Sequence, residues 1–203
     1  MKIICIGRNY ADHAKELNNP LPVKPVFFLK PDSALVYGNK PFFYPDFSSN
    51  IHHEVEFVIK INRLGRSIDK KFAYRYYDEI GVGIDFTARD LQDECKKNGL
   101  PWEISKAFDN SAPLGNFVLL KDIPDPSNMS LRLDINGKTV QQGSSADLIF
   151  SFDEIISYVS NFITLKIGDL IFTGTPAGVG PVKKSDRLQA FINDTMLLDF
   201  YVR

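Results

Sequence analysis

Short apolar runs recur along the chain and predict a protein built mainly from β-strands. Residues 131–135 alternate strictly between apolar and polar side chains, and Asn136-Gly137 follows them. Asn-Gly suits a type I′ turn, so we expect a hairpin into residues 138–142. The other expected strands are residues 2–6, 26–29, 42–44, 54–61, 80–86, 117–120, 170–173, 188–192 and 196–202.

Helical signals are fewer than strand signals. Residues 12–18 and 70–79 are expected to be helical. Thr87-Ala88-Arg89-Asp90 resembles a capping box that opens a helix ending at Asn98-Gly99, and Ser151-Phe152-Asp153-Glu154 is a second capping box. Because helices do not alternate regularly with strands, a doubly wound parallel sheet is disfavoured. We expect one β-rich α+β domain over residues 1–203, with a few peripheral helices.

Bulk composition excludes several classes of protein. The 203 residues carry a net charge of −1 without a basic stripe, so neither nucleic acid nor a membrane surface is an expected partner. No apolar run approaches the roughly 20 residues of a membrane span, and the apolar run at the N-terminus is too short for a signal peptide. Cys5 and Cys95 give no disulfide framework. We therefore expect a cytoplasmic protein.

Carboxylates supply the first chemical signal. Glu54 and Glu56 are two residues apart in an expected strand, so their side chains lie on one face, about 7 Å apart along the backbone. Asp85 ends another apolar run and would complete an all-oxygen site. Such a site suits a hard divalent ion such as Mg2+. His52 has the same strand parity, and its ligation would favour zinc or iron instead. A solvent face with two glutamates is the simpler alternative.

Three further segments carry candidate chemistry. His13 and Glu16 share a face if their segment is helical, and a carboxylate that orients an imidazole makes a general base. The glycine-rich turn at residues 174–180 can approach a ligand closely and offers the Thr175 hydroxyl, but it lacks the lysine of a phosphate-binding loop. Lys106 stands in an aromatic setting. Each also has an ordinary alternative, namely a surface pair, a plain turn and a surface lysine.

Taken together, four motifs resemble the fumarylacetoacetate hydrolase family, and most closely its branch of acylpyruvate hydrolase and oxaloacetate decarboxylase. The resemblance extends from Lys2 to the C-terminus, with the motifs in the same order. The motifs are Gly7-Arg8-Asn9-Tyr10-Ala11-Asp12-His13, His53-Glu54-Val55-Glu56, Asp85-Phe86-Thr87-Ala88-Arg89-Asp90 and Thr173-Gly174-Thr175-Pro176-Ala177-Gly178-Val179-Gly180.

The resemblance implies a mixed β-roll that assembles as a homodimer and binds Mg2+, with Mn2+ as an alternative. It implies a lid that carries a catalytic dyad and whose tip spans residues 18–22. By matched position it assigns metal binding to Glu54, Glu56 and Asp85, catalysis to His13, Glu16 and Lys106, and substrate binding to Arg8, Arg89, Gln92, Gly174 and Thr175.

The activity implied by the resemblance is hydrolysis of the C–C bond of acylpyruvates to pyruvate and a carboxylic acid, decarboxylation of oxaloacetate, or both. Each reaction passes through the enolate of pyruvate. An isomerase or hydratase acting on dienoic 2-oxo acids is the nearest alternative. A non-catalytic protein that binds oxo acids with a metal is the second, although binding alone needs no histidine–glutamate dyad.

Overall fold

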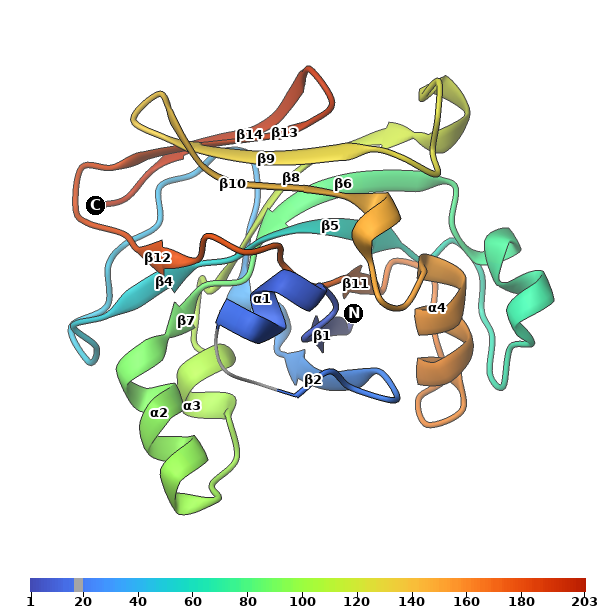
Figure 1. Cartoon of the computed structure of the whole chain (residues 1–203), viewed down its shortest axis with the longest axis horizontal. Helices are drawn as coiled ribbons and strands as arrows, with labels where there is room; N and C mark the ends of the chain where they lie inside the picture. The colour runs from blue at the N-terminus through green and yellow to red at the C-terminus, as the bar shows by residue number, and fades with distance from the viewer. Residues whose placement is uncertain (17–19) are drawn as a thin grey trace.

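The computed structural model describes residues 1–16 and 20–203, and its strands form three sheets (Figure 1). The largest sheet has seven strands in the order β2-β1-β11-β5-β6-β8-β3. It is mixed, because β1–β11 and β3–β8 are parallel while the other pairs are antiparallel. Its strands are β1 (Ile3–Gly7), β2 (Val26–Lys30), β3 (Leu35–Val36), β5 (Val55–Lys60), β6 (Glu79–Ile84), β8 (Ala112–Leu119) and β11 (Leu170–Phe172).

A second sheet of four antiparallel strands has the order β10-β9-β13-β14. Its strands are β9 (Ser130–Ile135), β10 (Lys138–Ser144), β13 (Arg187–Ile192) and β14 (Thr195–Tyr201). Asn136 and Gly137 connect β9 to β10 with φ angles of 53° and 78°, which confirms the hairpin expected from these two residues. The third sheet is small and joins β12 (Gly180–Pro181), β4 (Ile51–His53) and β7 (Thr87–Ala88).

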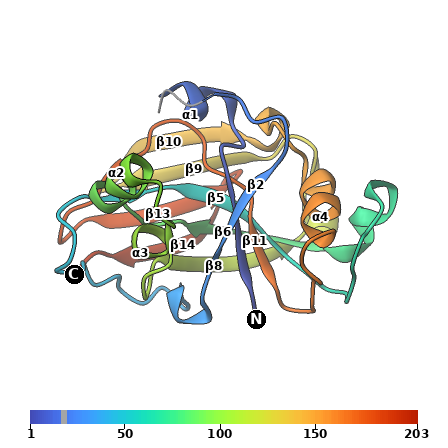
Figure 2. The same ribbon diagram turned by 90° about the horizontal axis from the view of Figure 1, so that it is seen from below.

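Helices lie at the periphery of the sheets. Helices α2 (Arg89–Asn98) and α3 (Glu103–Lys106) lie at one end of the molecule, and α4 (Phe152–Ser160) lies at the other (Figures 1 and 2). The Ser151 hydroxyl accepts a hydrogen bond from Glu154 N, and the Glu154 carboxylate accepts one from Ser151 N, so the expected capping box is confirmed. The remaining helical segments are α1 (Ala11–Glu16) and the short 3-10 helices η1 (Asp32–Ala34), η2 (Lys70–Tyr76), η3 (Leu120–Asp122) and η4 (Ser145–Asp147).

Two local expectations were wrong, and a third is confirmed in part. Residues 70–76 form the 3-10 helix η2, so the helix expected over residues 70–79 is present but ends at Tyr76, before strand β6. Thr87 does not cap α2, because it belongs to β7 and pairs with β4; Ala88 is the N-cap residue and offers no side-chain bond. Residues 42–44 make a single bridge between Phe42 and Val202 instead of a strand. At Thr87, pairing with a strand that is distant in sequence overrides the local signal.

The central strands β5 and β6 are almost entirely buried, and they position the candidate site. Val55, Phe57, Val58 and Ile59 are fully buried, so β5 has apolar neighbours on both faces. Glu56 stands within this strand and is only 1% exposed. A carboxylate in such surroundings needs a partner, because burial of an unpaired charge is strongly unfavourable.

The β-rich α+β class expected from the sequence is confirmed by these three sheets and the few short helices. Among residues 1–16 and 20–203, no helix is long and apolar enough to cross a membrane.

Candidate functional site

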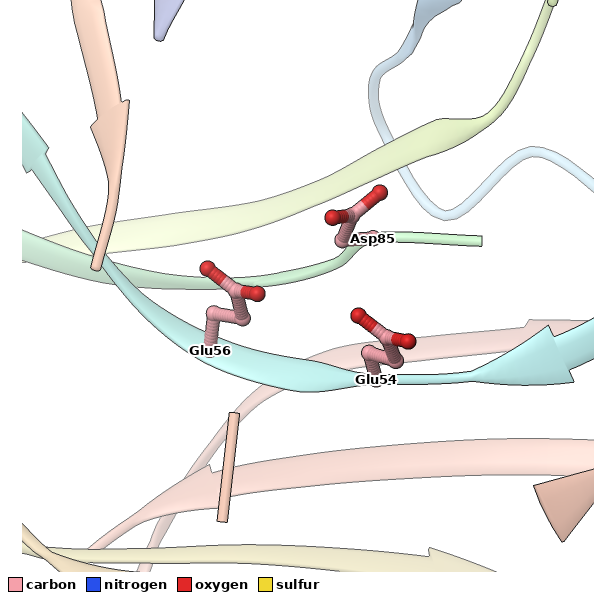
Figure 3. A group of neighbouring side chains, drawn as sticks. All are labelled: Glu54, Glu56 and Asp85. Atoms are coloured by element: carbon pink, nitrogen blue, oxygen red, sulfur yellow. The ribbon is translucent and has the colours of Figure 1, made fainter. Parts of the chain in front are cut away.

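Three buried carboxylates meet where β5 begins beside the end of β6 (Figure 3). Glu56 belongs to β5, and Glu54 occupies the junction between β4 and β5. Asp85 directly follows β6, and its backbone N donates a 2.8 Å hydrogen bond to the carbonyl oxygen of Glu54. One carboxylate oxygen from each residue lies within 4.8 Å of the others. The pairing of two neighbouring strands therefore brings together the three residues named from the sequence.

Three cations surround these carboxylates. The Lys106 ammonium group donates 2.8 Å hydrogen bonds to Glu54 Oε2 and to Asp85 Oδ2. The Arg89 guanidinium donates to Glu54 Oε1 at 2.5 Å. On the other side, Lys30 Nζ lies 2.8 Å from Asp85 Oδ1. Three positive charges thus offset three negative charges, which allows the group to be buried.

The pKa values of Glu54 and Glu56 shift in opposite directions. Burial opposes ionisation of Glu54, but the charges of Lys106 and Arg89 outweigh it and hold its pKa below the usual range. Burial also disfavours the charged form of Lys106, yet Asp85 and Glu54 raise its pKa. Glu56 differs because burial raises its pKa, and the negative charges of Asp85 and Glu54 raise it further.

A hard divalent cation fits this donor set. Asp85 Oδ1 is buried and accepts no hydrogen bond from the described residues, its contact with Lys30 being an ion pair. Glu56 accepts one 2.7 Å bond, from Gly174 N, and no salt bridge is formed by it among residues 1–16 and 20–203. Carboxylate oxygens that lie this close together are ligands of the kind that Mg2+ or Mn2+ prefers.

No histidine joins this group of ligands in the described chain. His52 Nε2 lies 3.0 Å from Asn50 Oδ1, and His53 Nδ1 lies 2.9 Å from Gln141 Oε1. Burial, together with the charge of Arg89, lowers the pKa of His52 to about 4. The structure therefore favours the all-oxygen site over the mixed site that the sequence left open.

His13 and Glu16 form a hydrogen-bonded pair on α1. His13 Nδ1 lies 3.2 Å from Glu16 Oε2, and the imidazole lines the same cavity as the three carboxylates. The Glu16 carboxylate also accepts from Gly178 N, at 3.1 Å and 3.3 Å to its two oxygens. Gly178 has a φ of 98°, and a Cβ atom there would lie 2.4 Å from the carbonyl oxygen of Val140. Only glycine fits this position, so the glycine-rich turn holds the dyad in place.

Four of the expected substrate-binding residues line the same cavity, namely Arg8, Arg89, Gln92 and Thr175, and so does Lys106, which was expected to be catalytic. Arg89 Nη1 donates a 2.6 Å bond to Gln92 Oε1, which leaves the Gln92 amide NH2 as a donor. Gly174, the fifth expected substrate-binding residue, is not part of the cavity lining, and its N–H donates to Glu56. Of the expected lid tip, residues 18 and 19 lie outside the described chain.

Sequence reasoning missed Lys30, which is 2% exposed at the end of β2. Besides Asp85, its ammonium group contacts Ser111 Oγ at 2.9 Å, Ser111 O at 3.2 Å, Phe86 O at 3.3 Å and the carbonyl oxygen of Lys106. The available signal was a lysine that closes the apolar run Val-Phe-Phe-Leu-Lys. A lysine in such a run requires a buried anion.

The fold is β-rich, and its cavity holds three buried carboxylates that could bind a metal ion beside a histidine–glutamate pair. The model of the fumarylacetoacetate (FAA) hydrolase C-terminal family matches residues 2–200. The chain belongs to the fumarylacetoacetate hydrolase family, as its motifs indicated.

Individual relatives show which members of the family the chain is similar to. The chain is 45% identical to the mitochondrial oxaloacetate tautomerase FAHD1 of Bos taurus, over 98% of this chain and 90% of the relative. It is 43% identical to the oxaloacetate tautomerase YcgM of Escherichia coli, over 92% of this chain and 86% of the relative. Among solved structures, fumarylpyruvate hydrolase from Pseudomonas aeruginosa in complex with Mn2+ and pyruvate matches with a TM-score of 0.93 and 38% identity, over 100% and 89% of the two chains. These relatives support catalysis on oxo acids.

Proposed function

We propose that this protein is a divalent-metal-dependent enzyme that converts 2-oxo acids through their enol or enolate forms, with oxaloacetate as a substrate. The observation that carries the proposal is the position of the His13–Glu16 dyad in the cavity that contains Glu54, Glu56 and Asp85. A metal held by carboxylates and a neighbouring general base are the two groups needed to remove a proton from a carbon next to a carbonyl. We propose Mg2+ as the ion and Mn2+ as its alternative.

Each residue of the site has a separate role in the proposed enolisation. When bound, the metal would supply Lewis acidity toward the 2-oxo group. Arg89 and the Gln92 amide hold the substrate carboxylate. His13 Nε2 accepts a proton from C3, and Glu16 stabilises the resulting imidazolium through Nδ1. The Lys106 ammonium offsets the negative charge that develops on the 2-oxygen. Transfer of the proton from the His13 imidazolium to that oxygen completes the conversion from keto to enol form, and the reverse steps restore the ketone. The names of the two tautomerase relatives support this reaction.

Hydrolysis of acylpyruvates is a second candidate for the same site. Here His13 removes a proton from water as its oxygen attacks the C4 carbonyl, with Gln92 donating to the oxyanion. The C3–C4 bond then breaks, its electron pair forms the enolate of pyruvate, and a proton from the imidazolium completes the products. Decarboxylation of oxaloacetate gives the same enolate and CO2 without an activated water. The similarity to a fumarylpyruvate hydrolase supports the hydrolytic reaction.

Two assays on one preparation test these reactions. Equilibration of the enol and keto forms of oxaloacetate is followed by ultraviolet absorbance, and pyruvate release from oxaloacetate and acetylpyruvate is coupled to lactate dehydrogenase. Each assay is run with Mg2+, with Mn2+ and with EDTA. We expect metal-dependent rates above the spontaneous rates, and their ratio assigns the principal reaction. Absence of all three activities despite metal-dependent oxalate binding would contradict the proposal and favour a non-catalytic binding protein.

Assembly and location belong to the same proposal. We propose a homodimer, which light scattering after size-exclusion chromatography tests by measuring the mass in solution. The two free, buried cysteines support a reducing compartment such as the cytoplasm. Cell fractionation distinguishes the cytoplasm from the mitochondrion that appears in the name of the bovine relative.

A further inference from the structure

A bulge in β10 directs one amide side chain toward the candidate site. The β9–β10 register pairs Thr139 with Asp134 and Gln141 with Leu133, so Val140 is the extra residue of the bulge. Bulges of this kind re-aim side chains next to functional sites. Gln141 is only 1% exposed, whereas the next residue, Gln142, is exposed.

The Gln141 amide makes four hydrogen bonds that fix its orientation. Its Oε1 accepts from Val55 N at 3.0 Å and contacts His53 Nδ1 at 2.9 Å. Its Nε2 donates to Thr175 Oγ1 at 2.8 Å and to the carbonyl oxygen of Pro176 at 2.9 Å. A backbone N–H can only donate and a backbone carbonyl can only accept, so a flipped amide would face a donor with a donor and an acceptor with an acceptor.

The fixed amide determines what the Thr175 hydroxyl can do. A threonine hydroxyl has one proton to donate and two lone pairs that accept. Because Gln141 Nε2 donates to one lone pair, the proton of Thr175 cannot point toward Gln141 and remains available to another partner. No group among residues 1–16 and 20–203 accepts that proton, and Thr175 lines the cavity with Glu56 and Asp85. The hydroxyl is therefore a donor aimed at the ligand space.

We propose that Gln141 is a positioning residue that orients the Thr175 hydroxyl as a hydrogen-bond donor for an anionic oxygen of the ligand. The inference rests on the proposed function, since it assumes that the cavity binds a 2-oxo acid. It adds a basis for specificity: ligands that present a carboxylate or oxo oxygen to Thr175 are favoured over ligands that present a donor there. Gln141 also holds both neighbours of Glu54, namely His53 and Val55.

The test compares two replacements of Gln141. If Gln141 positions the Thr175 hydroxyl, Gln141→Glu should weaken ligand binding more than Gln141→Met. If Gln141 serves only stability, Gln141→Met should weaken it more. Gln141→Glu keeps the shape and the acceptor of Val55 N, but it replaces the NH2 donor with an acceptor that attracts the Thr175 proton. Gln141→Met removes all four bonds and leaves the hydroxyl free to rotate. Calorimetry measures binding of oxalate, which offers only acceptors when ionised, to the Mg2+-loaded protein. Titration of Mg2+ and thermal unfolding are recorded for each variant, and Gln142→Glu is the matched control.

We expect Gln141→Glu to weaken oxalate binding by about 10-fold to 100-fold, the range for loss of a hydrogen bond to a charged group. Gln141→Met should weaken it less, and Gln142→Glu should leave it unchanged. In a Thr175→Val background, most of the effect of Gln141→Glu should disappear, because the hydroxyl through which it acts is gone.

Several results would overturn the inference. These are oxalate affinity within about twofold of wild type for Gln141→Glu, a larger loss for Gln141→Met than for Gln141→Glu, or an equal loss with and without Thr175. Failure of both Gln141 variants to fold would also overturn it, since Gln141 would then serve stability and not recognition. If the unmodified protein does not bind oxalate, the proposed function fails, and this inference fails with it.

Discussion

Lys30 offers a direct test of how the buried charges are balanced. Its ammonium group lies 2.8 Å from Asp85 Oδ1, and the side-chain exposures of the two residues are 0% and 2%. Lys30→Met preserves most of the side-chain volume but leaves Asp85 Oδ1 without its cation. The oxygens of Phe86 and Ser111 lose their donor as well. Removing one partner of a buried pair costs about 3–5 kcal/mol of folding free energy. Since domains are stable by only about 5–15 kcal/mol, the loss should be large.

The matched control is Lys70→Met, because Lys70 lies 2.6 Å from Glu154 and both side chains are exposed by more than a third. Exposed pairs contribute about 0–1 kcal/mol, so this variant should stay close to wild type. Urea unfolding of the metal-free proteins, followed by circular dichroism, measures both. A combined Lys30→Met and Asp85→Asn variant should recover part of the loss, because no buried charge is then left alone. Equal free energies of unfolding for Lys30→Met and Lys70→Met would refute the reasoning.

Three further outcomes are expected at the site. Gly178→Ala should lower kcat by about 10²-fold, as for a 1 Å misplacement of the dyad, because the added Cβ would lie 2.4 Å from the carbonyl oxygen of Val140. The control is Gly168→Ala, which is also at positive φ but has open space around it. Equal kcat values for the two variants would contradict the prediction. His13→Ala should lower acylpyruvate hydrolysis and oxaloacetate tautomerisation by about 10²–10⁴-fold, but oxaloacetate decarboxylation less, and equal losses of all three would reject this division of roles. Burial and the neighbouring carboxylates raise the pKa of Glu56, so protonation of Glu56 stabilises the metal-free fold. This stabilisation is present below the ordinary glutamate pKa and is lost as the pH rises through the raised pKa. The affinity for Mg2+ should rise over the same pH window. Mg2+ calorimetry across about pH 5 to 8 should show proton release on binding, and a pH-independent affinity would speak against it.

The sequence predicted the clustering of the three carboxylates better than it predicted the helices. Glu54, Glu56 and Asp85 were predictable because strand alternation places two carboxylates together and the third ends another apolar run. The hairpin at Asn136-Gly137 was predictable because its turn depends on local backbone conformation. The supposed cap at Thr87 failed because pairing with β4, which is distant in sequence, decides the conformation of this residue.

Lys30 and Gln141 escaped prediction for a related reason. Each acts through residues far away in sequence, since Lys30 contacts Ser111 and Gln141 contacts Thr175. Nothing in the local pattern indicates that a bulge re-aims Gln141 or that the end of β2 lies beneath Asp85. Such contacts depend on the order of strands in a sheet, which composition and spacing do not specify.

The origin of the two chemical groups has a consequence for how the reaction can change over evolution. The carboxylates come from the junction of paired strands in the interior, whereas the His13–Glu16 dyad comes from α1, a helix of six residues outside the sheets. Under the proposed function, substitutions in α1 and in the turn that holds Glu16 would alter the proposed general base, while the three carboxylates would keep their positions. The groups proposed to move protons and the groups proposed to hold the ion could then change independently of each other.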